Sequence, residues 1–413
     1  MEKRRVVVTG MGALTPIGKT VEESWEAAKA GKCGIDTITQ YDSSNQKVHL
    51  AGEVKGFNAE DYLERREARR MDRFTQFAVI AAGQALENSG LDLEKEDRGN
   101  IGVIVSSGIG GINTIQAETL KGGEKGFDKV SPFFIPMVIA NMAAGQIAIK
   151  YGLQGMCTCP VSACAGGSNA IGDAFRHIRD GYSDVVLCGG AEAAITPLGM
   201  GGFTSLKALT TCSDPARASI PFDAERSGFV MGEGAGILVL ESYEHAKARG
   251  AHILGEIVGY GSNCDAHHIT APCPDGAGAT ACMRMALADG NVPAGEVDYI
   301  NAHGTSTSLN DSGETMAVKN AFGEHAQHLM MSSTKSMTGH LLGASGAVAS
   351  IFCVLALRDQ FAPPTIHYQV PDPACDLDIV PNEGRSATIR YAMANAFGFG
   401  GHNASLIFKH WEE

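Results

Sequence analysis

The stretches AAGQALENSGLDLEKEDRGNIGVIVSSGIGG (residues 81–111) and ACMRMALADGNVPAGEVDYINAHGTS (residues 281–306) decide the fold, because they share one order of elements. Each runs from a helical segment through a polar stretch into an apolar strand, and each ends in a small-residue loop. Each is followed later by a helix rich in small residues, at 162–181 and 343–360, and both helices close on Arg-Asp. The sequence therefore predicts an internal duplication.

Strands and helices alternate around these two units. The predicted strands are Arg5–Val8, Ile101–Ser106, Val185–Cys188 and Val297–Asn301. The predicted helices are Val21–Ala30, Asp72–Asn88, Gly167–Arg179, Ala279–Ala288 and Gly346–Arg358. This alternation indicates an α/β protein with mostly parallel sheets, and no low-complexity linker separates its halves.

Composition excludes several classes of function. Of 413 residues, 44% are apolar and 19% charged, as in a globular protein, and the net charge of −13 argues against nucleic acid as a partner. Eleven cysteines without framework spacing predict reduced thiols, and no N-terminal signal precedes the first strand, so we expect a cytoplasmic protein. The apolar run Leu341–Leu357 approaches membrane-spanning length but is rich in Gly, Ala and Ser; we expect a buried helix and no membrane insertion.

Cys164 is the first candidate for chemistry, in the motif Pro160-Val-Ser-Ala-Cys-Ala-Gly-Gly-Ser168. An amphipathic helix leaves this motif, and the helix dipole is expected to favour a thiolate and lower the pKa of the cysteine. A cysteine taken alone is more often a small buried apolar residue. The other ten cysteines, including Cys157 and Cys159, are interpreted as structural.

Two histidines follow predicted strands or precede the second small-residue helix. His303 lies in Asn301-Ala-His-Gly-Thr-Ser-Thr307, and His340 ends Ser333-Thr-Lys-Ser-Met-Thr-Gly-His340. Each alone is more often a structural histidine. Together with Cys164 they form the set expected of a thioester intermediate, and a second histidine with Lys335 supplies donors for an enolate oxygen.

Other motifs remain open or fail. The loop Phe397-Gly-Phe-Gly-Gly-His-Asn403 is either a turn between strands or a gate with an oxyanion donor. Two glycine-rich stretches, at Gly108 and Gly232, lack a full dinucleotide-binding fingerprint. The segment Asp265-Ala-His-His268 does not predict a metal site, because adjacent histidines on a strand face opposite sides.

Together these motifs resemble the β-ketoacyl-acyl-carrier-protein synthase family of condensing enzymes, which have a thiolase-like fold. The likeness covers essentially the whole chain and includes SPFFIPMVIANMAAG from Ser131, RSGFVMGEGAG from Arg226 and SSTKSMTGHLLGA from Ser332. It implies two duplicated α/β halves, residues 1–250 and 251–413, in a layered α-β-α-β-α arrangement with mixed, mostly parallel sheets. It also implies a homodimer. For this sequence we expect neither cofactor nor metal.

The resemblance implies decarboxylative condensation of an acyl group on Cys164 with malonyl-carrier in fatty acid elongation. It makes His303 and His340 assist decarboxylation, with Lys335 holding their network and Glu314 supporting it. The N–H groups of Cys164 and Phe399 would form an oxyanion hole, and Phe399 would gate the malonyl side. Further positions match residues that touch the phosphopantetheine arm or line the acyl pocket: Thr270, Thr305 and Thr307 for the arm, and Ile109 for the pocket.

Acyl carrier protein is the implied partner. A basic run stands out in this acidic chain; from the residues alone it is better explained as a solvated helix with Glu64 and Glu67 as ion-pair partners. With the resemblance, carrier docking is favoured for Arg66, Arg69, Arg70 and Lys207.

One departure from the family pattern affects a cofactor. Ala349 stands where a buried glutamate associated with water or a monovalent cation is usual, which puts a bound cation in doubt. Three alternatives remain: a specialised polyketide ketosynthase, a non-catalytic partner subunit of the chain-length-factor type, and a thiolase. The presence of Cys164, His303, Lys335 and His340 argues against the second, and the lack of a cysteine after Cys375 argues against the third.

Overall fold

A computed structural model describes residues 3–412. Its main feature is a ten-stranded sheet whose two halves mirror each other. From one edge the order is β10 (Met330–Ser332), β9 (Val297–Asn301), β13 (Tyr391–Gly398), β14 (His402–Lys409), β8 (Gly255–Cys264), β1 (Val6–Leu14), β7 (Gly234–Ser242), β6 (Val185–Glu192), β4 (Ile101–Ser106) and β5 (Cys157–Thr158).

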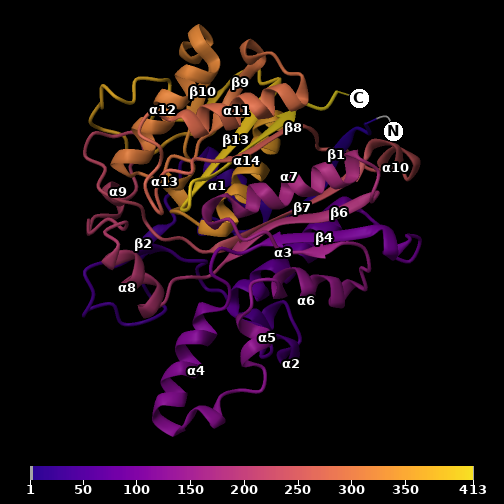
Figure 1. Ribbon diagram of the computed structural model, residues 1–413, viewed down its shortest axis with the longest axis vertical. Helices are drawn as coiled ribbons and strands as arrows, with labels where there is room; N and C mark the ends of the chain where they lie inside the picture. Colours follow the sequence, from indigo (N-terminus) through magenta and orange to yellow (C-terminus); the bar gives the residue numbers. More distant parts are fainter. Residues whose placement is uncertain (1–2, 413) are drawn as a thin grey trace.

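Helices and four short strands complete the chain (Figure 1). The longer helices are α1 (Val21–Lys29), α3 (Arg73–Ser89), α4 (Ile112–Lys125), α6 (Met142–Tyr151), α7 (Gly166–Arg179), α8 (Pro197–Ser205), α11 (Ala277–Gly290), α12 (Ser308–Phe322) and α14 (Ser345–Asp359). The shorter ones are α2 (Arg65–Ala68), α5 (Phe134–Val138), α9 (Pro215–Ala218), α10 (Tyr243–Ala248) and α13 (Lys335–Thr338). The short strands are β2 (Ile35–Thr37), β3 (Leu50–Gly52), β11 (Phe361–Ala362) and β12 (Arg385–Ser386).

The pairing pattern confirms the duplication. In one half β4 pairs in parallel with β5 and β6, while β7 runs antiparallel to β6 and β1. In the other, β9 pairs in parallel with β10 and β13, while β14 runs antiparallel to β13 and β8. The halves join through the antiparallel contact of β1 with β8. The sheet is mixed, as expected, but its parallel pairs are confined to the two ends and antiparallel pairs fill its middle.

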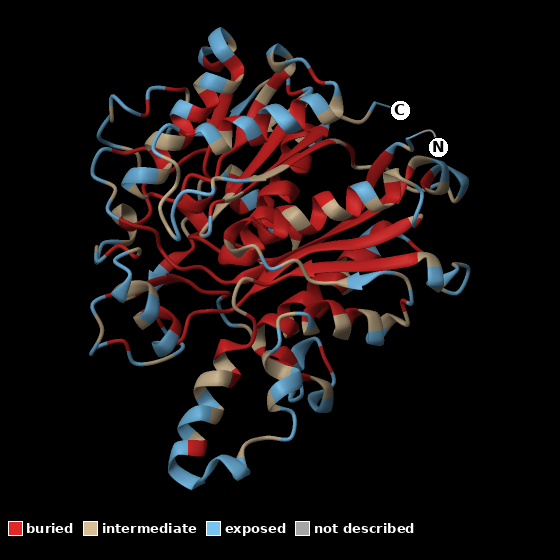
Figure 2. Cartoon of the chain, in the orientation of Figure 1, coloured by how far each residue is buried: buried red, intermediate tan, exposed pale blue. Residues whose placement is uncertain are grey.

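Helices form three layers around the two half-sheets. α7 and α14 pack against each other and lie between them, with α7 on β4 and β6 and α14 on β13 and β7. α3 and α6 cover the outer face of one half, and α11 and α12 cover that of the other (Figure 1). Figure 2 shows buried residues concentrated in the strands and the central helices, and exposed residues along α4 and the outer side of α11.

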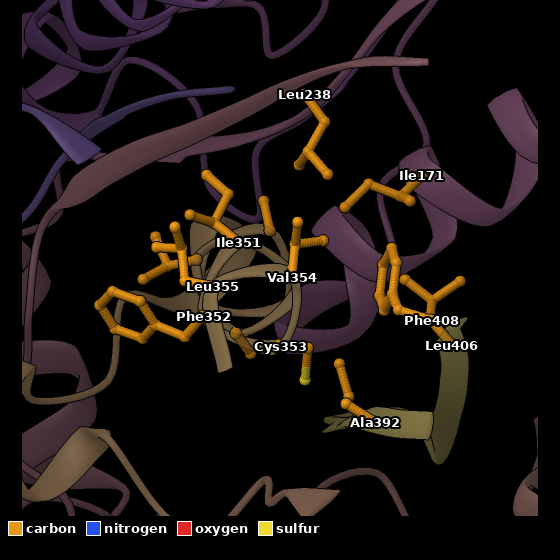
Figure 3. Close-up of a cluster of buried hydrophobic side chains, with 14 of the residues drawn as sticks. Ile171, Leu238, Ile351, Phe352, Cys353, Val354, Leu355, Ala392, Leu406 and Phe408 are labelled. Carbon is orange, nitrogen blue, oxygen red and sulfur yellow. The ribbon is translucent and has the colours of Figure 1, made fainter. Parts of the chain in front are cut away.

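The central helix α14 is buried at every position from Ser345 to Leu357. Phe352, Cys353, Val354 and Leu355 are each at most 1% exposed. Figure 3 shows Val354 on the side of Ile171 and Cys353 beside Ala392 of β13, whereas Phe352 points the other way, where it packs against Trp25. The segment Leu342–Asp359 has the length and hydropathy of a membrane span, but 89% of it is buried inside the protein. The expectation of a buried helix is therefore confirmed.

The same short helical turn precedes both central helices. A 3-10 turn at Ala163–Ala165 leads into α7, and another at Leu342–Ala344 leads into α14. Both begin on a non-glycine residue with positive φ, +49° at Ala163 and +45° at Leu342. Cys164 and Gly343 therefore hold equivalent positions in the two halves, and a left-handed residue directly precedes each.

A buried charge cluster at the far end of β7 makes stability depend on pH. His245 contacts Glu241 (2.7 Å) and Glu96 (3.0 Å), and these carboxylates raise its pKa from 6.5 to about 9. A raised pKa stabilises the folded state fully below pH 6.5, and this contribution is lost as pH rises through 9. We expect the thermal unfolding midpoint to fall over that interval, by an equivalent of up to about 3 kcal/mol. The variant His245→Gln should lack that slope; an identical slope in both proteins would contradict the assignment.

Candidate active site

A pocket of about 320 Å³ reaches Cys164 from the surface. Its wall comes from both halves of the chain: the end of α8, the segment before α11, the turn after β9 and the loop between β13 and β14. The residues that meet at its inner end are Cys164, His303, His340, Leu342 and Phe399. The duplicated fold thus brings together three side chains that are far apart in the sequence.

Cys164 lies in the turn before α7 and is 8% exposed. Its Sγ is 3.0 Å from Nε2 of His340. Gly166 leaves no room for a side chain, because a Cβ there would lie 2.0 Å from Oγ of Ser106. The sequence prediction of a cysteine at a helix N-terminus, next to an imidazole, agrees with this geometry.

The protonation state of Cys164 differs from the expectation. Burial raises the pKa of the thiol to about 12, whereas the sequence analysis expected the helix dipole to lower it. Lys335 and the backbone N–H groups of Phe399 and Cys164 favour the thiolate and offset burial only in part. The expected lowering was therefore wrong for the resting protein, since desolvation outweighs the charge of Lys335 and the backbone N–H groups. The thiol needs a base to become a nucleophile.

His340 is placed to be that base. Burial lowers the pKa of its imidazole well below 6.5, and nearby Lys335 lowers it further, so the ring is neutral. Its Nδ1 lies 2.8 Å from Oγ of Ser345, which fixes the ring while Nε2 faces Cys164. Its backbone N–H donates to the carbonyl of Val230 at 2.7 Å, and Phe229 packs edge-on against the ring at 5.2 Å.

His303 faces His340 edge-on, with ring centroids 5.3 Å apart. Burial also lowers the pKa of His303 well below 6.5, with Lys335 as the second cause. Within the described residues its Nδ1 has no hydrogen-bond partner. The pocket thus presents two neutral imidazoles, one in contact with the sulfur and one edge-on beside it.

Glu314 holds the turn that carries His303. Its buried carboxylate accepts the backbone N–H groups of His303 and Gly304, both at 2.8 Å. Lys335 is also buried: desolvation lowers its pKa to about 8, although the charge of Glu314 opposes this, and its Nζ donates to the carbonyl of Ala302 at 3.4 Å. Glu314 therefore supports the backbone beside His303 directly and acts on Lys335 through charge.

The loop after β13 touches the nucleophile. A Cβ on Gly398 would lie 3.1 Å from the backbone nitrogen of Cys164, so this position needs glycine. The N–H of Phe399 points toward the sulfur, and its ring packs against Phe203 with centroids 6.4 Å apart. Gly400 and Gly401 follow with φ of +84° and +76°, a conformation that favours glycine.

The expected substrate-binding residues divide into two groups. Thr270, Thr305 and Thr307 line the pocket, and the hydroxyls of the last two lie 2.9 Å apart. Ile109 is not among the residues that line it; it packs against the apolar cluster around Cys164.

The residues expected to dock the carrier lie at two separate places on the surface. Lys207 is exposed at the pocket mouth, while Arg66, Arg69 and Arg70 are exposed on or next to α2, away from α8 and the mouth (Figure 1). Glu67 pairs with Lys150 instead of a neighbouring arginine, and Arg70 lies over the ring of Phe133 at 4.8 Å. The ion pairs that would neutralise this run are therefore few.

Sequence reasoning missed several residues. Ser345, five positions after His340, orients that ring, and a serine at this spacing before a helix is the only signal it gives. Asp265 accepts hydrogen bonds from Asn403 (2.6 Å) and the N–H of Cys273 (3.0 Å), which ties two pocket loops together. Glu192, a buried carboxylate near Cys164, was also missed, because it does not belong to any of the motifs identified in the sequence.

A metal is not supported by the donor groups. Across residues 3–412, no group of three His, Cys, Asp or Glu side chains could hold a metal ion. Ala349 is 3% exposed in the apolar core and offers no carboxylate for the monovalent cation that the family pattern implies. The residue at this position does not fit that ion.

Solved structures establish the class. A structure titled "Crystal structure of a Beta-ketoacyl synthase from Burkholderia phymatum STM815" matches with a TM-score of 0.91 and 36% identity, covering 99% of this chain and 100% of that chain. A chain in the structure of a type II PKS acyl-carrier protein in complex with its ketosynthase matches with a TM-score of 0.92 and 37% identity. The match covers 99% of this chain and 100% of that chain. The fold and the pocket define a condensing enzyme of the thiolase-like type.

Sequence comparison identifies the family. The family model for the N-terminal domain of β-ketoacyl synthases matches residues 3–246. The family model for the C-terminal domain of β-ketoacyl synthases matches residues 254–369. Proteins named 3-oxoacyl-[acyl-carrier-protein] synthase 2 are 52% identical over 411 residues in Staphylococcus aureus (strain COL) and 52% identical over 413 residues in a Synechocystis species. Both alignments cover 100% of this chain and 99% of the relative. This chain belongs to the β-ketoacyl synthase family.

Proposed function

We propose that this chain is a 3-oxoacyl-[acyl-carrier-protein] synthase that condenses an acyl group on Cys164 with malonyl-carrier in fatty acid elongation. The observation that supports this assignment is the 3.0 Å contact between Cys164 Sγ and His340 Nε2, with His303 edge-on beside them. Incubating the protein with acyl-carrier and malonyl-carrier should yield 3-oxoacyl-carrier, CO2 and free carrier. The 37% identity to a type II PKS ketosynthase is weaker than the 52% identity to synthase 2 proteins, which favours fatty acid substrates.

In the first step Cys164 attacks the acyl thioester. Neutral His340 accepts the thiol proton as the sulfur–carbon bond forms, and the proton passes to the departing carrier thiolate. The oxyanion that develops on the acyl carbon is bound by the N–H groups of Cys164 and Phe399, which already point toward the sulfur. The acyl group remains on Cys164.

In the second step malonyl-carrier enters past Thr270, Thr305 and Thr307. After acylation the sulfur no longer carries a proton, and His340 takes the tautomer with its proton on Nε2 while the hydroxyl of Ser345 donates to Nδ1. The ring N–H groups of His303 and His340 then bind the thioester oxygen, so that loss of CO2 leaves an enolate stabilised by two donors.

The enolate carbon attacks the acyl carbon on Cys164; the carbon–carbon bond forms, the carbon–sulfur bond breaks, and the sulfur leaves as a thiolate. This thiolate takes up one proton from water to restore the resting thiol. Burial, and next the positive charge of Lys335, keep both imidazoles neutral, and Phe399 gates this side.

The carrier is proposed to dock on two basic surfaces, Lys207 at the pocket mouth and the arginines Arg66, Arg69 and Arg70 beside α2. The double variant Arg66→Glu/Arg69→Glu should raise KM for acyl-carrier about tenfold at low salt with kcat unchanged, because charge steering acts on association. The effect should shrink at high salt. The KM of Lys207→Glu for acyl-carrier, measured by steady-state kinetics, tests the surface at the pocket mouth separately.

Two controls separate docking from damage. Lys95→Glu makes the same charge change as Lys207→Glu, and half that of the double variant, at an exposed side chain that pairs with Asp92. It should leave KM unchanged. A small acyl thioester without a carrier should react equally well with all variants. An equal loss with this small substrate would refute the docking assignment.

We further propose a cytoplasmic homodimer whose chains divide at residue 250 into the two family halves. β5 is an edge strand of the main sheet, so its outer backbone groups are free to pair with a second copy. Exposed apolar side chains lie in and beside α5, α6 and β5: Ile135 (60%), Ile139 (41%), Ile149 (72%), Met156 (42%) and Val161 (59%). Sedimentation analysis should give twice the chain mass of 43.3 kDa.

A further inference from the structure

A buried carboxylate lies next to the active site without a role in the reaction described above. Glu192, the last residue of β6, is 0% exposed, and burial raises its pKa. Its Oε1 accepts from Oγ of Ser107 (2.9 Å) and the N–H of Ile109 (3.2 Å). Its Oε2 accepts from the N–H groups of Gly108 (2.7 Å) and Gly343 (3.0 Å). A charge this deep is retained only when it is fully hydrogen-bonded, as this one is.

The four donors come from both halves of the enzyme. Three belong to the Ser107–Ile109 loop after β4, whose Ile109 packs against the apolar cluster that contains Cys164. The fourth, Gly343, holds in its half the position that Cys164 holds in the other, and it follows His340 by three residues. Glu192 therefore joins the loop beside the nucleophile to the turn that leads from the catalytic histidine.

The surroundings leave no space for a looser arrangement. A Cβ on Gly108 would lie 2.8 Å from Oε2 of Glu192, and one on Gly343 would lie 2.5 Å from the nitrogen of Gly108. Because all four neighbours donate hydrogen bonds, an amide at this position would turn its own N–H groups toward donors. Glutamine is therefore not a conservative replacement for Glu192 here.

Glu314 provides a parallel on the malonyl side. It also is a buried carboxylate that accepts consecutive backbone N–H groups in the turn after a strand, those of His303 and Gly304 after β9. Glu192 accepts those of Gly108 and Ile109 after β4, in the other half of the duplication. Each half thus has one carboxylate that fixes one wall of the site.

We propose that Glu192 is a positioning residue for the acyl substrate: it fixes the Ser107–Ile109 loop against Gly343 and so sets the wall of the acyl site beside Cys164. This inference rests on the proposed function and adds a specificity determinant to it. The malonyl wall, carried by His303, Thr305 and Thr307, has its own support in Glu314 and does not touch Glu192.

The test is a comparison of the two substrates in the variant Glu192→Gln. We expect KM for long-chain acyl-carrier in Cys164 acylation to rise at least tenfold and the chain-length preference to change. KM for malonyl-carrier should stay within about twofold. The matched control is Glu241→Gln, since Glu241 is equally buried and binds Thr9, His245 and Arg249 at the far end of β7. It should lower the unfolding temperature without separating the two KM values.

A milder variant covers the case in which Glu192→Gln does not fold. Ser107→Ala removes one donor to Oε1 and should change the acyl KM in the same direction, by about threefold. Equal changes in both KM values, or no change in either variant, would overturn the proposal. Wild-type protein that fails to form an acyl adduct on Cys164 would instead refute the proposed function, so the two failures are distinguishable.

Discussion

The variant Cys164→Ala is expected to form no acyl-enzyme and no 3-oxoacyl product. The sulfur contacts a neutral base, His340 at 3.0 Å, and lies beside the N–H groups expected to bind the oxyanion. Without it no thioester exchange can occur, and condensation should fall to the detection limit. Intact-protein mass spectrometry after incubation with acyl-carrier measures the adduct directly.

The variant Cys164→Gln separates the two half-reactions. It cannot accept an acyl group, but His303 and His340 remain, so it should still release CO2 from malonyl-carrier. Radiolabelled CO2 release, compared with Cys353→Ala at a buried cysteine of the core, provides the readout. An acyl adduct on Cys164→Ala would remove Cys164 from its role, and adduct loss in Cys353→Ala would show that the assay reports stability instead.

Much of the fold could be predicted from sequence periodicity. The predicted strands Ile101–Ser106 and Val297–Asn301 match β4 and β9, and the predicted helix Gly167–Arg179 differs from α7 by one residue. These elements are buried and regular, so their apolar pattern carries the signal. Strand direction was harder: β13 and β14 were not predicted as strands, and they contribute antiparallel pairs to the middle of the sheet.

The candidate site was predictable only where motifs carry chemistry. Cys164, His303 and His340 stand out by residue type and by their loops, and the fold brings them together at the inner end of one pocket. The raised pKa of Cys164 was not predictable, because desolvation depends on packing between distant segments. Ser345, Asp265 and Glu192 act through hydrogen bonds to loops distant in sequence or to a neighbouring ring, which leave no local pattern.

The two histidines are expected to fail in different ways when replaced by alanine. His340 contacts the sulfur, so His340→Ala should slow both acylation of Cys164 and decarboxylation of malonyl-carrier. His303 faces His340, and within residues 3–412 its ring makes no hydrogen bond to the sulfur. His303→Ala should therefore slow decarboxylation about 10²- to 10³-fold while acylation changes far less. That loss corresponds to about 3–4 kcal/mol for one donor to a developing oxyanion.

Two assays measure the effects separately. Acylation is followed in single-turnover experiments on proteins that retain Cys164, and CO2 release is followed in the Cys164→Gln background. Each assay is run with and without the histidine changes. His325→Ala serves as a control, because this histidine is half-buried and binds the carbonyl of Val297 at the opposite end of β9. Because only His340 contacts the sulfur among these two histidines, we expect the acylation rate of His303→Ala to exceed that of His340→Ala. Equal loss of acylation in both would mean that the base for Cys164 is the pair of imidazoles acting together, and the division of labour proposed from the 3.0 Å contact would be wrong.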